Sequence, residues 1–213
     1  MRGVKALEKR IIAISREYGS GGRHIGELLA SDLGIPFYDK EIIQMASEKS
    51  GLSAGFIEKS DESMPNTFLH NLKYSGYTSY DSISFYDTPV TDKVFLAQSS
   101  VIKELASRGS CVIVGRCAGY ILRDDPALVA IFIRGAIEDR IRHAVENYGF
   151  PSQNAMERIR KIDRSRTNYY KYYTSRQWGS IDHFDLVINS SFTGIDGAVA
   201  VIKTMLREKS NAE

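Results

Sequence analysis

The chain of 213 residues carries a formal net charge of +2, and its apolar and charged fractions are those of globular proteins. This length suffices for one α/β domain with a single core, and this composition excludes wholesale disorder. The small net charge gives no basis for non-specific nucleic-acid binding, so we expect no nucleic-acid partner.

The cysteines and the N-terminal residues indicate a cytoplasmic protein. Cys111 and Cys117 have no metal-ligand spacing with the histidines, and we expect free thiols in a reducing compartment. Residues 1–10 are charged and lack the apolar segment of a signal peptide. No stretch approaches the roughly 20 apolar residues that span a bilayer, so we expect no membrane partner.

The N-terminal part of the chain alternates strands and helices. Residues 11–14 are a short β-branched run, which predicts a buried strand, and residues 18–22 follow as a glycine-rich turn. A helical pattern occupies residues 23–33 and ends at a glycine. Residues 35–38 predict a second strand, and residues 41–49 predict a second helix.

Residues 61 to about 90 interrupt this alternation, because they are rich in Tyr, Ser, Asn and Asp. An irregular segment of this length is uncommon unless it has a function. We predict an excursion over the end of the sheet that carries the glycine-rich turn. Its aromatic residues either line a pocket or, as we favour, anchor the segment; they include Phe68, Tyr74, Tyr77, Tyr80 and Phe85.

The rest of the chain continues the alternation of strands and helices. Strands are predicted at residues 111–114, 128–133 and 186–188, and helices at residues 92–107, 137–147, 152–176 and 195–207. This alternation is typical of a parallel sheet that helices cover on both faces. We therefore predict a single α/β domain of three layers, built on a five-stranded parallel sheet.

A strand, a glycine-rich turn and the start of a helix coincide at residues 11–33. Glycines allow backbone N–H groups to converge on an anion, and the helix presents its positive end to the same point. Arg23, near the start of the helix, adds a side-chain charge. A tight connection without a ligand is the alternative, but the coincidence of these features favours a phosphate-binding loop.

Several motifs occur along the chain in the order of a known family. They are residues 12–23 (IAISREYGSGGR), 36–41 (PFYDKE), 114–116 (VGR), two tyrosine pairs before Trp178, and residues 184–189 (FDLVIN). Together they resemble the cytidylate kinase-like proteins, a divergent bacterial branch of the nucleoside monophosphate kinases.

The resemblance implies a P-loop kinase fold with a substrate-binding arm at about residues 39–90 and a lid at about residues 152–180. It also implies transfer of the γ-phosphoryl group of ATP, with Mg²⁺, to a nucleoside monophosphate, for which CMP or dCMP is the first choice. The strict pattern G-x-x-x-x-G-K-[ST] is absent. Gly22 and His24 occupy the lysine and hydroxyl positions of ordinary cytidylate kinases, and Cys117 replaces the Asp of their Arg-Asp pair.

We expect the donor phosphates to bind the loop and the first turn of the helix, namely Gly19, Ser20, Gly21, Gly22, Arg23 and His24. The guanidinium of Arg23 would partly replace the absent lysine. Arg116 directly follows a buried strand, and we expect it to bind the acceptor phosphate; the alternative is a surface arginine paired with an Asp. Asp39 and Lys40 either contact the acceptor or cap a helix, and for Asp39 we favour the cap.

Residues 157–176 are densely basic. Arg160 and Arg164 share a helical face, and we expect them, with Arg166, to neutralise transition-state charge from a lid. A solvated helix face is the alternative. The tyrosines at 169–170 and 172–173 are expected to pack in the core or in an interface, which is compatible with a homodimer.

Phosphoryl transfer depends on positioned substrates and cations, so we assign no general base, and the histidines predict no metal site on the protein. Three hypotheses stay open. The first is a nucleotide kinase, and the second is a kinase of another small molecule on the same fold. The third is a nucleotide-binding regulatory protein without turnover, which the altered loop would allow.

Overall fold

The computed structural model describes residues 9–60 and 90–212. The predicted excursion and its aromatic residues, Phe68, Tyr74, Tyr77, Tyr80 and Phe85, lie outside the described residues. None of the helices in these two ranges has the length and apolar character needed to cross a membrane.

Five strands form one parallel sheet in the order β2-β3-β1-β4-β5. They are β1 (Ile11–Arg16), β2 (Phe37–Tyr38), β3 (Cys111–Val114), β4 (Leu128–Arg134) and β5 (Leu186–Asn189). The connection from β1 leads to β2 on one side of the sheet, whereas the connection from β3, the neighbour of β1, leads to β4 on the other side. The carboxyl ends of β1 and β3 therefore form a topological switch point, where open α/β sheets bind ligands.

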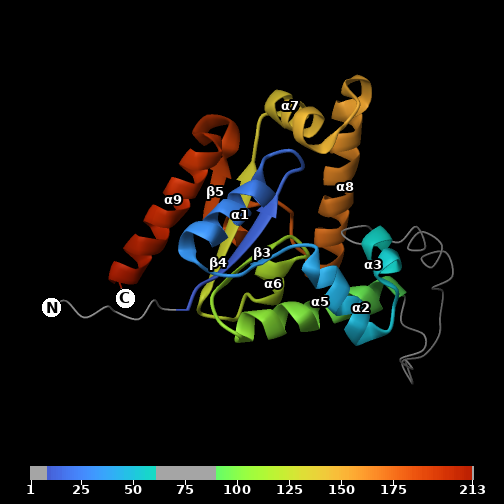
Figure 1. Cartoon of the computed structure of the whole chain (residues 1–213), viewed down its shortest axis with the longest axis vertical. Coiled ribbons are helices and arrows are strands. Elements are labelled where there is room, and N and C mark those ends of the chain that lie inside the picture. The colour runs from blue at the N-terminus through green and yellow to red at the C-terminus, as the bar shows by residue number, and fades with distance from the viewer. Residues whose placement is uncertain (1–8, 61–89, 213) are drawn as a thin grey trace.

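Helices cover both faces of the sheet, as the sequence predicts (Figure 1). The α-helices are α1 (Gly22–Leu33), α2 (Glu41–Ser50), α3 (Ala54–Ser60), α5 (Val90–Ser107), α6 (Ala118–Ile121), α7 (Ile137–Tyr148), α8 (Ala155–Thr174) and α9 (Ser190–Ala212). Two 3₁₀ helices, Ser152–Asn154 and Ile181–His183, precede α8 and β5.

The core consists of two apolar clusters on opposite faces of the sheet. Successive residues of a strand point to opposite faces, so Ile11 belongs to the cluster beneath α2 and α5 whereas Ile12 belongs to the cluster beneath α1 and α9. Both side chains are fully buried, and each such burial stabilises the fold by about 2 kcal/mol. Burial on both faces explains why the strands are continuous apolar runs in the sequence.

The structure confirms the predicted α/β class and adds α3 and α6, two short helices that the sequence analysis did not identify. The closing helix was predicted to begin at residue 195, whereas α9 begins at Ser190. The difference lies at Gly194, whose φ of 68° interrupts the helical backbone inside α9. Tyr169 and Tyr170 pack in the core beneath α2 and α5, which confirms a packing role for this pair.

Candidate active site

The turn between β1 and α1 contains two glycines in the left-handed conformation, Gly19 with a φ of 79° and Gly21 with a φ of 76°. Glycine adopts this conformation without the penalty that a Cβ brings. At Gly19, a Cβ would also overlap the backbone oxygen of Arg140 in α7. The glycines are therefore required by the shape of the turn and by its close packing.

The first turn of α1 is open to an anion. Helix α1 begins at Gly22, so its first N–H groups have no carbonyl partner within the helix, and its first turn carries no acidic side chain. The positive end of the helix dipole lies at the same point. The Ser20 hydroxyl donates to the Glu17 carbonyl oxygen at 2.8 Å and is directed inward. The groups of this turn that face an anion are therefore backbone N–H groups.

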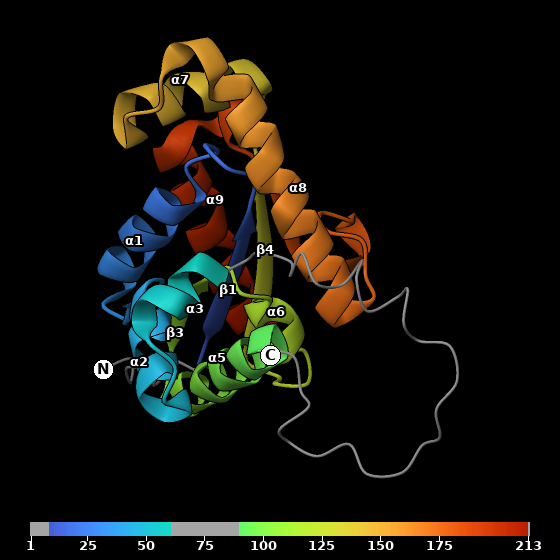
Figure 2. The same cartoon turned by 90° about the vertical axis from the view of Figure 1, so that its right-hand side faces the viewer.

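A cavity of about 800 Å³ lies over the glycine turn and reaches from α2 and α3 to α8. Basic side chains outnumber acidic ones in its lining. The basic ones are Arg16, Arg23, Lys40, Arg116, Lys161 and Arg166, and the acidic ones are Glu17, Asp39 and Glu58. A cavity of this size with an excess of positive charge suits phosphorylated ligands. In both views α7 lies at the end of the sheet toward which β1 runs, and α8 starts there and runs back along the sheet (Figures 1 and 2).

Asp39 binds two arginines of this cavity. Its carboxylate accepts hydrogen bonds from Nε of Arg23 at 2.9 Å and from Nη1 of Arg116 at 3.1 Å. The expected N-cap is therefore wrong: α2 begins after Lys40, and no side chain caps it. Burial alone would lower the pKa of Arg23, but the hydrogen bond to Asp39 and the charge of Glu27 raise it, so the guanidinium stays protonated.

Arg116 is buried, with 3% of its surface exposed, so it is not a surface arginine. The other part of that alternative interpretation, a pairing with an Asp, is present, because Arg116 forms an ion pair with Asp39. It lies in a strained turn, because Gly115, Arg116 and Cys117 all have positive φ, at 82°, 49° and 56°. For the two residues that are not glycine this costs about 1 kcal/mol each, and strain of this kind is concentrated at functional sites.

Helix α8 faces the cavity with Lys161, Ile162, Ser165 and Arg166. Arg166 donates from Nη1 to the Arg16 carbonyl oxygen at 3.1 Å and lies 5.5 Å from the centre of the Tyr18 ring. Arg160 and Arg164 share one face of α8, as the sequence predicts. Both are exposed on that face, which differs from the face toward the cavity, and neither lines the cavity.

Most of the predicted site residues meet around this one cavity. They are Gly19, Gly21, Gly22, Arg23, Asp39, Lys40, Arg116 and Arg166. Ser20 is buried beneath the turn, and His24 is exposed outside the lining. Lys161, Arg140 and Asp163 were not predicted from the sequence to belong to the site.

An ion pair between the buried Arg140 of α7 and the partly buried Asp163 of α8 lies beside the turn. The position of Arg140 in the helical repeat of α7 is a sequence signal that could have identified this ion pair. Arg140 lies four residues before the buried Ala144, so it occupies the helix face that packs inward. An arginine on that face requires a charged or polar partner, because an unpaired buried charge is costly.

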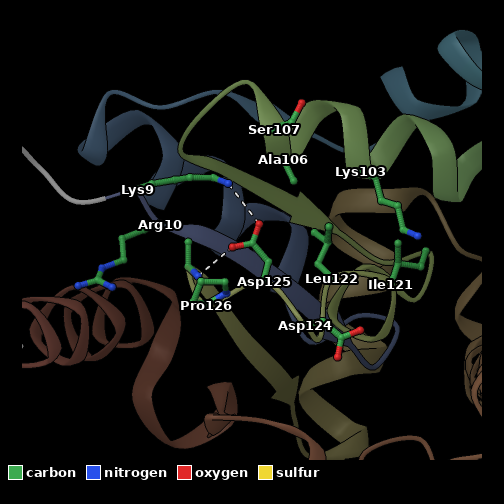
Figure 3. Close-up of a pocket in the computed structure, with 11 residues that line it drawn as sticks. Lys9, Arg10, Lys103, Ala106, Ser107, Ile121, Leu122, Asp124, Asp125 and Pro126 are labelled. Carbon is green, nitrogen blue, oxygen red and sulfur yellow. Dashed lines mark hydrogen bonds and ion pairs between the residues drawn. The ribbon is translucent and has the colours of Figure 1, made fainter.

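A second cavity, of about 930 Å³, lies at the opposite ends of the strands (Figure 3). It is formed by residues that precede β1 and β4 and by the end of α5, and an ion pair between Lys9 and Asp125 crosses it at 3.2 Å. It is slightly larger than the cavity at the glycine turn. The smaller cavity is the better candidate site, because it lies at the carboxyl ends of the strands and includes a helix N-terminus.

Within the described residues, no group of three or more Asp, Glu, His or Cys side chains is arranged to hold a metal ion. The Asp39 carboxylate is occupied by two arginines, and that of Glu17 accepts the Gly135 N–H at 2.9 Å. Mg²⁺ bound by one or two carboxylates and substrate phosphates needs no such cluster. Mg²⁺ that arrives with a phosphorylated ligand would therefore be held mainly by the phosphates and by water.

Comparison with known proteins identifies the family. The sequence matches the cytidylate kinase-like family over residues 11–192. A cytidylate kinase from Ignicoccus hospitalis is 22% identical over 197 residues, which are 92% of this chain and 98% of that protein.

Solved structures show the same fold. An uncharacterized protein from Eubacterium ventriosum is 25% identical with a TM-score of 0.68, over 93% of this chain and 99% of that one. Shikimate kinase from Bacteroides thetaiotaomicron is 14% identical with a TM-score of 0.54, over 94% of this chain and 99% of that one. The sheet and its flanking helices therefore have the P-loop kinase fold. Because the sequence match extends from β1 into α9, the chain belongs to the cytidylate kinase-like family.

Proposed function

We propose that this protein transfers the γ-phosphoryl group of ATP to a nucleoside monophosphate, with CMP or dCMP as the first candidates. The observation that carries the proposal is the open N-terminus of α1, which faces a cavity lined by basic side chains from four parts of the chain. Membership of the cytidylate kinase-like family and the similarity to a curated cytidylate kinase support it.

The donor phosphates would bind the N–H groups of the glycine turn. Lys161 and Arg166 on α8 also line the cavity, where cations would stabilise the charge of the transferred phosphoryl group. Arg116 and Lys40 lie on the side of α2, where they would hold the acceptor phosphate. These residues hold two substrates in line and exclude water, which is most of what phosphoryl transfer requires.

Mg²⁺ bound to the nucleotide would supply further positive charge at the phosphates. Asp39 takes no part as a general base in this proposal, because two guanidinium groups hold its carboxylate. Its role is to orient Arg23 and Arg116.

One observation favours a nucleotide-binding regulatory protein as the second candidate. Gly22 stands where ordinary cytidylate kinases have lysine, and Arg23 is paired with Asp39 and Glu27. A loop without a cation dedicated to the donor could bind ATP and transfer its phosphate slowly or not at all.

A panel of nucleoside monophosphates with Mg²⁺-ATP tests the two candidates. The kinase proposal predicts that one member, CMP or dCMP first, is converted to its diphosphate. Shikimate belongs in the same panel, because shikimate kinase has the same fold. Tight ATP binding without turnover on any acceptor would contradict the kinase proposal and support the regulatory one.

A further inference from the structure

The turn after β1 is held from outside by the ion pair between Arg140 of α7 and Asp163 of α8. The Asp163 carboxylate accepts the N–H of Tyr18 at 2.8 Å, and Nε of Arg140 donates to the carbonyl oxygen of Tyr18 at 2.8 Å. The two members of one ion pair therefore bind both backbone polar groups of a single residue, immediately before Gly19.

A third charged group completes this cluster. The Glu17 carboxylate accepts the Gly135 N–H at 2.9 Å and lies 3.4 Å from Nη1 of Arg140. The side chains of Arg140 and Asp163 are only 8% and 18% exposed. Charge-assisted hydrogen bonds in such surroundings are strong and directional, so the cluster fixes the backbone that leads into the glycine turn.

Helix α8 contacts the same turn at a second point. Arg166 donates to the carbonyl oxygen of Arg16 at 3.1 Å, and Lys161 lines the cavity from the preceding turn of the helix. Asp163 lies between these two cations in the sequence. The helix that supplies positive charge to the cavity is thus the helix that holds the turn, and α7 and α8 meet above it (Figure 2).

We propose that Arg140 and Asp163 are positioning residues, which fix the phosphate-binding turn to α7 and α8 so that the loop N–H groups and the α8 cations face one polyphosphate. The nature of this ligand rests on the proposed function. In ordinary phosphate loops a lysine within the loop bridges to the phosphates; here the turn is shaped by an ion pair outside it.

The test uses Asp163→Asn and Arg140→Gln, singly and together, with Arg142→Gln as the matched control. Arg142 pairs with Asp139 on the exposed side of the same helix. The dissociation constant for ATP, measured by calorimetry without an acceptor, is expected to rise roughly tenfold in each single variant, since hydrogen bonds between charged groups are lost. The double variant should bind no more weakly than either single variant, because the residues act as one unit. The control should bind like the wild type.

Amide hydrogen exchange separates positioning from general destabilisation. In both single variants the Tyr18 amide should exchange faster while the amide of Ile12 in β1 does not. Equal acceleration at both amides, or folded variants that bind ATP as tightly as the wild type, would overturn the inference. Wild-type protein that binds no ATP would instead overturn the proposed function, and exchange at Tyr18 would then decide whether the ion pair holds the turn.

Discussion

The carboxylate of Asp39 accepts a hydrogen bond from Arg116 at 3.1 Å, although 77 positions separate the two residues in the chain. Asp39 follows β2 and Arg116 follows β3, and these two strands are parallel neighbours, so both residues reach the same edge of the sheet. Because the same carboxylate also binds Arg23, the cavity is less positive than its arginines alone would make it. Phosphate would bind these arginines in competition with Asp39.

Replacing Arg116 with methionine should lower the free energy of unfolding by about 3 kcal/mol, because the buried Asp39 loses its buried partner. The same change at Arg23, whose side chain is 44% exposed, should cost less than about 1 kcal/mol. Urea denaturation measures both values. Equal losses would show that the burial of Arg116 is not what stabilises the pair.

Arg116→Met should also weaken acceptor use more than donor binding. We expect the KM for the nucleoside monophosphate to rise by roughly tenfold to a hundredfold, as for a lost charged contact to phosphate, with little change in the dissociation constant for ATP. Initial-rate kinetics and calorimetry on the folded variant provide the two numbers. Parallel losses of donor and acceptor affinity would contradict the assignment of Arg116 to the acceptor.

Gly19→Ala should disrupt the turn, because φ is positive there and the new Cβ would overlap the Arg140 backbone. Gly51→Ala is the control: its φ of 70° is similar, but nothing lies within 4 Å of the added Cβ. The control should lose about 1 kcal/mol of stability from backbone strain alone, and Gly19→Ala should lose more and should also lose ATP binding. Thermal melts and calorimetry compare the two. Similar melting temperatures would mean that the turn relaxes around the new methyl group.

Lys161→Gln and Arg160→Gln remove one positive charge each from neighbouring positions of α8. Lys161 lines the cavity whereas Arg160 is exposed outside it, so only the first change should raise the KM for ATP, by about fivefold to tenfold. Steady-state kinetics at constant ionic strength measures the difference. A larger effect from Arg160→Gln would indicate that α8 presents its other face when the nucleotide binds.

Alkaline pH should destabilise the protein through Cys111. Burial raises the pKa of this thiol to about 11 from an ordinary value of 9.0, so the folded state keeps its proton where the unfolded state loses it. The contribution is complete below pH 9 and is lost as the pH rises toward 11, by an amount of about 2–3 kcal/mol. In urea denaturation between pH 8 and 11, the free energy of unfolding should therefore fall more steeply with pH for the wild type than for Cys111→Ala. Identical profiles would contradict this origin.

The sequence predicted those parts of the fold that local patterns encode. Continuous apolar runs such as residues 11–14 indicated buried parallel strands, and the glycines before residue 23 indicated a turn at the end of β1. These predictions succeeded because period, β-branching and glycine content act within a few residues of each other. The predicted N-cap at Asp39 failed for the opposite reason, since Arg23 and Arg116 offer this carboxylate stronger partners than the backbone of α2 does.

The sequence by itself therefore determined the α/β class, the place of the glycine turn and the presence of a basic helix after β4. Only the tertiary structure decided which face of that helix meets the turn, so that Lys161 lines the cavity while Arg160 does not. It also decided that Arg140 and Asp163 meet beside Tyr18. A helical repeat specifies which residues share a face, but the direction of that face depends on packing between elements far apart in the chain.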